Sequence, residues 1–386
     1  MLWVILGYAL GTSIGISIVP FIRVFKIVFV IGSLIFVLYK NGISTFFLIN
    51  NLSLYLIIFF VSFLSFFADE PFKALYKSLT FVYPFLYLVF SVNYLLRYGV
   101  INFLIGVSFA VLLVYALVPL SFYLIGGNLD DNIVYGYTEG NFFVSNHYGW
   151  GSTLFILSSL TIVRFYPLKT LHKIVIYIFL PLALYLLIIS ANRAGILSVF
   201  IAFVLFFIMD RQSSFTTKFI LFFGALMVFF IVGIQEDSAI DFIIQKNESQ
   251  LESGIEGRLI GTNAMIRSFE NNPTYWFTGV GMFNYTELKL NGGVLGVYHN
   301  SYWEILFGSG IIVFAIFLNY VVFRPVIVFW KISGAYSLLL IPLIIIPFFE
   351  SNLTAGQFLF FPWFIYMILL NAKEFTFMEN QKKEIK

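Results

Sequence analysis

Cysteine is absent from this sequence, and charged residues make up only 11% of it. Without cysteine, neither a disulfide framework nor a thiolate metal site can form. Soluble domains carry roughly 25% charged residues, so the shortage of charge excludes an ordinary water-soluble protein. Apolar residues take its place: 60% of the 386 residues are hydrophobic, and phenylalanine alone occurs 50 times. Lipid must therefore solvate most of this surface.

Apolar runs long enough to cross a bilayer recur along the chain. A spanning helix needs about 20 predominantly apolar residues. Twelve segments qualify, at residues 1–22, 25–39, 46–67, 79–96, 99–125, 148–163, 174–190, 194–209, 218–234, 301–323, 334–349 and 353–371. The first lacks the basic start and cleavage site of a signal peptide, so we expect it to be retained. The pattern predicts an all-α, polytopic protein with one transmembrane domain over residues 1–386.

Two connections between these segments are long, at residues 126–147 and 235–300. Lys and Arg usually concentrate in short cytoplasmic loops. With both termini in the cytoplasm, 13 Lys and Arg residues lie on the inner side and five lie in the short outer loops. Residues 235–300 then form a large periplasmic loop between spans 9 and 10. Arg23 and Lys26 oppose the pattern, which leaves the orientation of the first hairpin open.

The predicted spans are almost free of charged side chains, and Glu304 near the start of the tenth is the main exception. Transporters and pumps usually keep ionisable groups at membrane depth, and many transporters carry helix breaks in symmetric halves. This chain instead gathers its ionisable groups at the outer surface. The pattern argues against a lipid or polysaccharide transporter and favours chemistry at the outer interface.

The periplasmic loop is predicted to contain an amphipathic helix. Ser253-Gly254-Ile255-Glu256 has the spacing of a capping box, and Asn271-Asn272-Pro273 predicts the end of the helix. We expect this helix to lie on the membrane surface, with Arg258 in its first turn. Its apolar residues at helical spacing are Leu259, Ile260, Met265, Ile266 and Phe269. Aromatic residues that either stack on sugars or form an interfacial belt are Tyr275, Trp276, Phe283, Tyr285 and Tyr298.

Three further positions carry candidate chemistry. Arg193 lies in the tight turn Ser190–Gly195 and faces outward, against the usual charge bias. Such an Arg either extends to lipid headgroups or binds a diphosphate through paired hydrogen bonds. Arg258 opposes the dipole of its own helix, so either it is solvated or bound to lipid headgroups, or its placement has another reason. His299, just before the tenth span, either anchors the helix end or takes a proton from a hydroxyl near neutral pH.

These positions fall into three motifs in a fixed order. The motifs are Asn192-Arg193-Ala194-Gly195; Gly257-Arg258-Leu259 with Asn272-Pro273 and Gly279-Val280-Gly281; and His299-Asn300 followed after nine residues by Gly310-Ile311. Together with the twelve spans and the large outer loop, they resemble the O-antigen ligase and Wzy-type polymerase superfamily of bacterial glycan assembly. Asn192 departs from the Ser or Thr common at its position. The resemblance covers the architecture of the whole chain and implies a GT-C-like fold.

The resemblance also implies an activity and roles for these residues. Proteins of this kind transfer a glycan from undecaprenyl diphosphate to a sugar hydroxyl. His299 would be the general base, while Arg193 and Arg258 would neutralise the leaving diphosphate without a metal. No cofactor is expected. Candidate helpers are Arg267, Lys73, Asn300 and His147, whereas His172 falls in an inner loop and receives no role.

A metal-dependent mechanism is the main alternative. It would use acidic pairs on the outer side with a divalent ion. Asp69-Glu70 and Asp130-Asp131 lie there, but neither has the Asp-x-Asp spacing. The simpler interpretation is that both pairs solvate loops.

The expected protein is a multi-pass enzyme of the bacterial inner membrane whose active site faces the periplasm. The leading hypothesis is a polymerase that joins lipid-linked repeat units into O-antigen or capsule-like polysaccharide. A ligase that moves finished polymer to the lipid A core is the runner-up, and no motif separates the two. Expected partners are the lipid-linked glycan, the bilayer and a chain-length regulator, with no nucleic acid.

Overall fold

The structure, a computed structural model, describes residues 52–68, 70–72, 74–75, 145–165, 168–189, 192–209, 262–281, 289–290, 293–294, 300–327 and 337–349, and the single positions 32, 35, 39, 78 and 223. These residues are predominantly helical. Helices were found in six of the predicted spans, at 46–67, 148–163, 174–190, 194–209, 301–323 and 334–349. The spans at 1–22, 79–96, 99–125 and 353–371, and nearly all of 25–39 and 218–234, lie outside the described residues.

The main helices are α4 (Leu52–Leu64), α7 (Ser145–Phe165), α8 (Thr170–Ile189), α9 (Arg193–Met209), α13 (Ser301–Leu318) and α15 (Ser337–Phe349). A 3₁₀ turn, η1 (Ser65–Phe67), extends α4, and a π-helical turn, η4 (Asn319–Phe323), extends α13. Within the described part of the chain, two helical segments are long and apolar enough to cross a membrane: Thr170–Ile188 and Ser301–Ile327. Three more are apolar but shorter: Leu52–Phe67, Gly151–Val163 and Ala194–Leu205.

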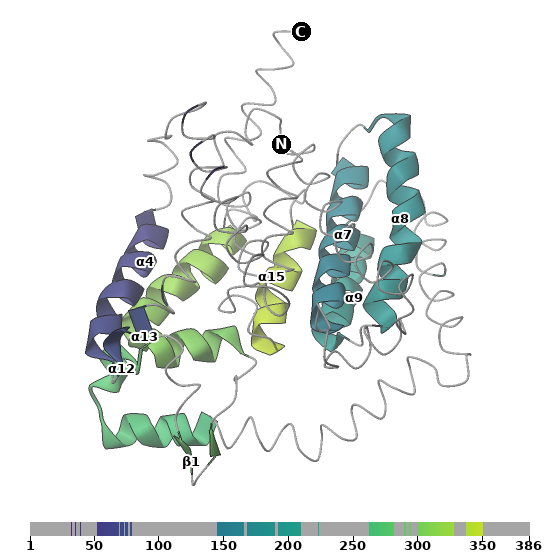
Figure 1. Ribbon diagram of the computed structural model, residues 1–386. Coiled ribbons are helices and arrows are strands. Elements are labelled where there is room, and N and C mark those ends of the chain that lie inside the picture. The colour runs from purple at the N-terminus through teal and green to yellow at the C-terminus, as the bar shows by residue number, and fades with distance from the viewer. Residues whose placement is uncertain are drawn as a thin grey trace.

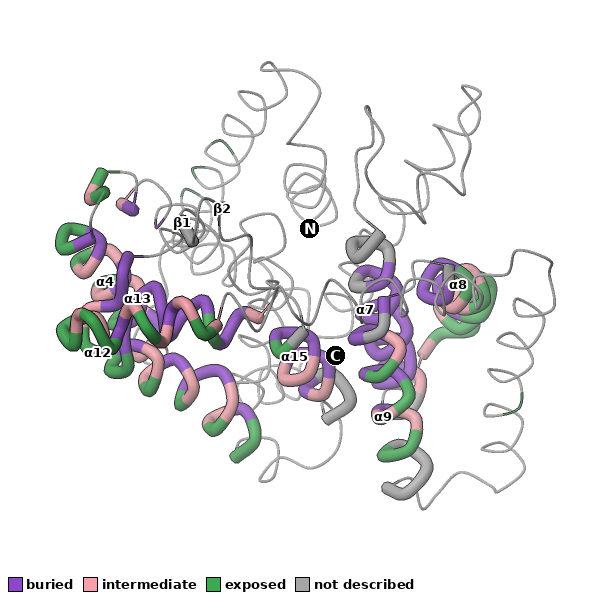
Figure 2. Tube along the Cα trace, turned by 90° about the horizontal axis from the view of Figure 1, so that it is seen from below, coloured by how far each residue is buried: buried purple, intermediate pink, exposed green. Residues whose placement is uncertain are grey.

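Helix α15 connects two groups of helices (Figures 1 and 2). It packs against α7 and α9 on one side and against α13 on the other, while α13 also packs against α4. Residues 151–162 of α7 are all buried, and their small hydroxyl side chains permit close approach of neighbouring helices. Helix α8 exposes Leu171, Ile178 and Tyr185, as expected of a lipid-facing helix.

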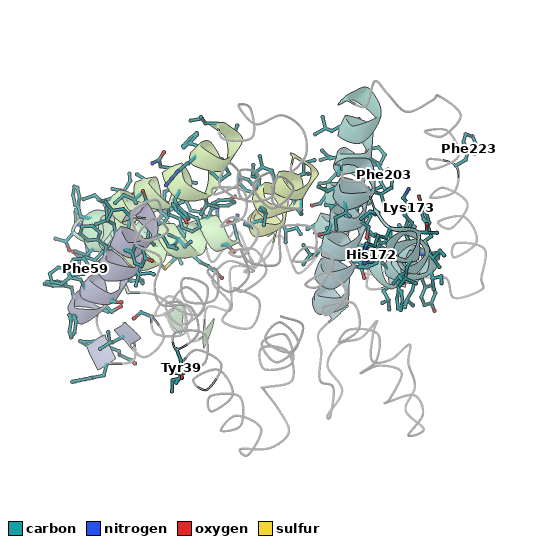
Figure 3. All side chains as sticks on the ribbon, turned by 90° about the horizontal axis from the view of Figure 1, so that it is seen from above. Tyr39, Phe59, His172, Lys173, Phe203 and Phe223 are labelled. Carbon is teal, nitrogen blue, oxygen red and sulfur yellow. The ribbon has the colours of Figure 1, made fainter. Side chains whose placement is uncertain are left out.

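Helices α7 and α9 begin at the same end of their group. Gly149, near the start of α7, lies against Asn192, which directly precedes α9, so both helices start on the same side. Helix α8 has 20 residues, a length of about 30 Å. His172 lies in the first turn of α8 rather than in the loop predicted for it (Figure 3), at the opposite end of α8 from the residues that lead to Arg193.

Helix α13 is broken at Gly310, which the sequence pattern did not predict. Gly310 has φ 75° and ψ 174°. The ring centroids of Tyr302 and Phe317 lie 6.3 Å apart, whereas a continuous helix would separate these residues by about 22 Å along its axis. Figure 1 accordingly shows α13 as two arms that meet at an angle. The second arm and its extension, residues 311–327, cover about 25 Å, so most of the membrane-crossing length belongs to them.

Residues 279–281, from the long connection before α13, dock on this break. Such a break leaves backbone groups without their helical partners, at a cost of several kcal/mol each if they meet lipid. The N–H of Val280 donates to the Phe307 carbonyl at 2.9 Å, and the N–H of Gly281 donates to the Gly308 carbonyl at 3.1 Å. We call residues 279–281 the glycine strap. Its hydrogen bonds satisfy two carbonyls that the kink would otherwise leave open.

The predicted amphipathic helix is present over residues 262–271 and ends where Asn271-Asn272-Pro273 indicated. Its apolar face packs on protein rather than lipid: Met265 and Phe269 form a buried cluster with Val280 and Phe307. Tyr275 and Trp276, around α12 (Tyr275–Thr278), pack against Phe269 and complete this cluster. These two aromatic rings therefore act in packing, and the start of the predicted helix lies outside the described residues.

The loop also contains a minimal hairpin, a small departure from the all-α prediction. Strand β1 (Lys289–Leu290) pairs antiparallel with β2 (Gly293–Val294), with Lys289 opposite Val294. In the sequence, Asn291-Gly292 separates the strands, and this dipeptide is the strongest signal for a two-residue hairpin.

Candidate functional site

The turn that carries Arg193 is held by a helix cap. The side-chain Oδ1 of Asn192 accepts a hydrogen bond from the Gly195 N–H at 2.7 Å, and the Asn192 carbonyl accepts from Ile196 at 2.9 Å. Asn192 is buried, at 2% exposure. Asn, Ser and Thr all cap helices through a side-chain oxygen, which explains why Asn can replace the family's usual Ser or Thr here.

Arg193 is the first residue of α9. The first N–H groups of a helix have no intrahelical acceptor, and they carry the positive end of the helix dipole. An anion near this end would meet both those N–H groups and a guanidinium attached to the same turn. The local structure thus suits phosphate binding.

Helix α7 packs closely on this turn. A Cβ built at Gly149 would overlap the Cβ of Asn192, and one built at Gly195 would lie 2.7 Å from Oγ1 of Thr153. His147 lies in the first turn of α7, two residues before Gly149. The backbone of His147 therefore starts a helix beside the Arg193 turn. Our sequence analysis missed the packing role of Gly149, although a glycine inside a helical pattern is the signal for such close contact.

The start of α13 is capped in the same way. Asn300 has the extended conformation of an N-cap (φ −151°, ψ 103°), and its Oδ1 accepts from the N–H groups of Tyr302 and Trp303, both at 3.1 Å. Asn300, predicted as a helper, thus has a demonstrable role in fixing the helix that follows His299.

Contacts with α15 hold this end of α13 toward the other helix group. The Tyr302 hydroxyl donates to the Ile344 carbonyl at 3.2 Å, and the Tyr302 and Phe348 rings lie 4.5 Å apart. Because α15 also packs on α7 and α9, the break at Gly310 directs the Asn300 end toward the helices that carry Arg193 and His147. A straight α13 would instead have placed Tyr302 about 22 Å from Phe317 along one axis.

The other predicted site residues are less informative. Arg267 is exposed on the face of helix 262–271 opposite Met265 and Phe269, and the structure does not link it to the starts of α9 or α13. His299, Arg258 and Lys73 lie outside the described residues, as do the side chains of Arg193 and His147. Of the two acidic pairs, only Glu70 is described, and it is exposed.

Glu304 is a residue to which the sequence analysis gave no role. It lies in the first turns of α13 and is only 1% exposed. The signal for it was present, because it is the main charged residue inside the predicted spans. Burying a carboxylate is costly unless it interacts with other polar groups. The buried position of Glu304, between the Asn300 cap and the break at Gly310, therefore marks it as a residue of interest.

The break itself is predicted to tolerate only glycine. Gly279 and Gly310 both have positive φ with ψ near 180°, a region essentially restricted to glycine that costs other residues about 1–3 kcal/mol. A Cβ on Gly310 would also overlap the Phe277 carbonyl. We expect Gly310→Ala to lower the free energy of unfolding by at least about 1–3 kcal/mol, measured by SDS titration in mixed micelles.

Gly32→Ala is the matched control for this experiment, because a Cβ at Gly32 meets nothing within 4 Å. Equal losses of stability in the two variants would contradict the docking of the glycine strap on α13.

Comparison with known families agrees with this site. A family model described as O-antigen ligase matches residues 178–318. The matched region includes the Arg193 turn, the glycine strap, the Asn300 cap and the Gly310 break. No curated protein matches the chain. The match confirms the resemblance found in the motifs: residues 178–318, which hold all three motifs, are similar to the O-antigen ligase family.

Proposed function

We propose that this protein is a glycosyltransferase that polymerises undecaprenyl-diphosphate-linked repeat units into O-antigen or capsule-like polysaccharide. One observation carries the proposal: the capped starts of α9 and α13 bear two of the family motifs and lie within the matched region, and both helices pack against α15. Membrane enzymes of this superfamily act on lipid-linked glycans.

The proposed chemistry is a direct transfer. The oxygen of an acceptor hydroxyl attacks the anomeric carbon of the donor sugar, and His299 takes the hydroxyl proton. The bond from that carbon to the phosphate oxygen breaks, and its electron pair leaves with undecaprenyl diphosphate. Arg193 and Arg258 stabilise the negative charge that grows on the diphosphate. The free N–H groups at the N-terminus of α9 add to this stabilisation, because they lie at the same end of the helix as Arg193.

The proposed setting is the outer face of the bacterial inner membrane. About twelve spans, cytoplasmic termini and a periplasmic loop at 235–300 would place the Arg193 turn and the start of α13 on the periplasmic side. The polyprenyl tail would remain in the bilayer against apolar helices. The short-loop distribution of Lys and Arg supports this orientation.

A transfer assay with purified protein tests the enzyme proposal. Protein in detergent is mixed with lipid-linked oligosaccharide, and product length is followed by gel electrophoresis. Chains longer than one repeat unit are the expected product. A transporter needs a membrane separating two compartments, so it would leave the substrate unchanged under these conditions.

A ligase is the second candidate, because the matched family model is described as O-antigen ligase. Deletion of the gene distinguishes the two. Loss of a polymerase leaves surface glycan capped with one repeat unit. Loss of a ligase leaves bare lipid A core and accumulates long lipid-linked chains.

Transfer is expected to continue at its normal rate in excess EDTA. The physical reason is that two guanidinium groups supply the positive charge that a divalent ion would otherwise bring to the diphosphate. The measurement is the initial rate with and without chelator after dialysis. A rate that falls with EDTA and returns with Mg²⁺ or Mn²⁺ would instead favour the acidic pairs Asp69-Glu70 and Asp130-Asp131.

A further inference from the structure

The first arm of α13, residues 301–310, presents a single side chain to the outside. Trp303 is 38% exposed, whereas every other residue of this arm is buried. Trp303 lies in the first turn of the helix, and its backbone N–H donates to Oδ1 of Asn300 at 3.1 Å. A large aromatic side chain is therefore displayed beside the Asn300 cap, which belongs to one of the three motifs.

The indole of Trp303 is held flat against a buried ring. The ring centroids of Trp303 and Phe307 lie 5.2 Å apart with an interplanar angle of 13°, so the two rings are stacked across one helical turn. Phe307 is fully buried and packs edge-on against Phe269 of helix 262–271. Because Phe307 covers one face of the indole, the exposed surface of Trp303 lies on the opposite face and on the ring edges.

The second arm of α13 exposes a different kind of surface. Beyond the break, the exposed large side chains of α13 and its extension are Ile311, Ile312, Phe323, Val326 and Ile327. These aliphatic and phenyl groups recur over about 25 Å of helix, as contact with lipid requires. The exposed side chain of the first arm instead combines a wide apolar face with an N–H donor and lies beside a polar cap. Lipid tails offer no acceptor to that donor, whereas the hydroxyls of a sugar do.

We infer that Trp303 is a sugar-binding platform on which a pyranose ring of the glycan stacks, an inference that rests on the proposed function. A pyranose ring is amphipathic, because its C–H groups form an apolar face and its hydroxyls surround the rim. The C–H face covers the indole on the side opposite Phe307, and the indole N–H donates to a rim hydroxyl. This contact positions one sugar of the lipid-linked glycan at the capped start of α13.

The packing beneath Trp303 suits it to this role. A ligand loses affinity when its binding must immobilise a side chain that was free before. The stack on Phe307 and the Asn300 cap fix Trp303 without a ligand. The glycine strap fixes the other end of the same arm through the Phe307 and Gly308 carbonyls. The ring is therefore preorganised, and little of the stacking energy is lost in ordering it.

Trp303→Leu tests the platform in the transfer assay, because leucine is apolar but has no flat ring. KM for the lipid-linked oligosaccharide should rise about 2- to 10-fold. The value of kcat should not change, since stacking is equally strong in the ground state and the transition state. Trp303→Phe, which keeps a ring, should recover most of the binding. Phe59→Leu is the matched control: Phe59 on α4 is 60% exposed and stacked on Phe63 at 6.0 Å (Figure 3), and its loss should leave KM unaltered.

A binding measurement that needs no catalysis separates this inference from the proposed function. The chain has six tryptophans, so protein labelled with fluorotryptophan in lipid nanodiscs can be followed by fluorine NMR, and Trp303→Phe identifies the Trp303 signal. The probe is the free oligosaccharide released by mild acid from the lipid-linked repeat unit. Titration with this probe should shift the Trp303 signal, whereas spin-labelled lipid should relax it only weakly.

A Trp303 signal that the oligosaccharide leaves in place and that spin-labelled lipid relaxes strongly would overturn the inference, because it assigns Trp303 to the interfacial aromatic belt. This result is obtained on the unsubstituted protein and holds even if Trp303→Leu does not fold. A Trp303→Leu variant that loses stability but keeps its KM would also overturn the inference, by assigning the ring to packing. A shifted signal in protein that forms no glycan product supports the platform and counts against the proposed function alone.

Discussion

Replacement of His299 by alanine is expected to reduce glycan transfer by about 10²- to 10⁴-fold, the usual contribution of a positioned general base. The donor is already activated by its diphosphate, so the remaining obstacle is the proton of the acceptor hydroxyl. Alanine cannot accept that proton. Cells carrying His299→Ala should therefore lack long-chain glycan although the protein is inserted in the membrane at its normal level.

His172→Ala is the matched control for this variant. His172 begins α8, at the opposite end of that helix from the Arg193 turn, and its loss should leave chain length unchanged. The measurements are the initial rate of transfer in detergent and the glycan ladder from cells. A normal ladder in His299→Ala would remove this residue from the mechanism.

Arg193→Ala is expected to lower kcat by about 10²- to 10³-fold, comparable to the loss of a donor that stabilises charge in a transition state. Because the charge on the diphosphate grows as the glycosyl bond breaks, the interaction strengthens along the reaction. Arg193→Lys should recover only a small part of the rate, because an ammonium keeps the charge but cannot contact two phosphate oxygens as a planar fork does.

Lys173→Ala provides the control for removal of a cation, since Lys173 is exposed near the start of α8 (Figure 3). Its rate should equal that of the unsubstituted protein. If Arg193→Ala kept full activity, Arg193 would be a lipid-headgroup anchor, and the diphosphate site would have to lie elsewhere. Stability of the variant in detergent separates a lost interaction from lost folding, because the Asn192 cap of α9 does not depend on the Arg193 side chain.

Helix positions within the described chain could be predicted closely from hydrophobic runs. The predicted spans 148–163, 174–190 and 194–209 correspond to α7, α8 and α9 to within a few residues. The residues at which these helices begin and end are set by local sequence, because polar turns and caps such as Asn192 end the apolar runs. The stop of helix 262–271 was predictable for the same reason, since Asn272-Pro273 cannot continue a helix.

The break in α13 could not be predicted from these signals. Residues 301–323 form a mostly apolar run with Glu304 as its charged residue, and glycine inside such a run is common in membrane helices. The break exists because the glycine strap, about thirty residues earlier, donates two hydrogen bonds to the carbonyls of Phe307 and Gly308. A contact between distant segments of the chain therefore decides the local conformation at Gly310.

For the amphipathic helix too, the sequence predicted the helix and tertiary packing decided what covers its apolar face. Its apolar stripe was visible in the sequence, but the stripe alone is equally compatible with lipid or protein as a partner. Packing of Phe269 against Phe307, with ring centroids 5.4 Å apart, decides for protein. The helix thus covers the first arm of α13, and the buried position of Glu304 on that arm also follows from tertiary packing.

Composition, apolar runs and short motifs were sufficient to indicate a helical membrane protein and its resemblance to the O-antigen ligase family, because lipid solvation and helix capping act over neighbouring residues. They were also sufficient to select Arg193 and His299 as candidates. Only the tertiary structure showed that the Asn300 end of α13 packs against α15, which also packs against α9. The reason is that the backbone groups opened at Gly310 need partners, and the glycine strap, a distant segment of the chain, donates hydrogen bonds to the carbonyls of Phe307 and Gly308.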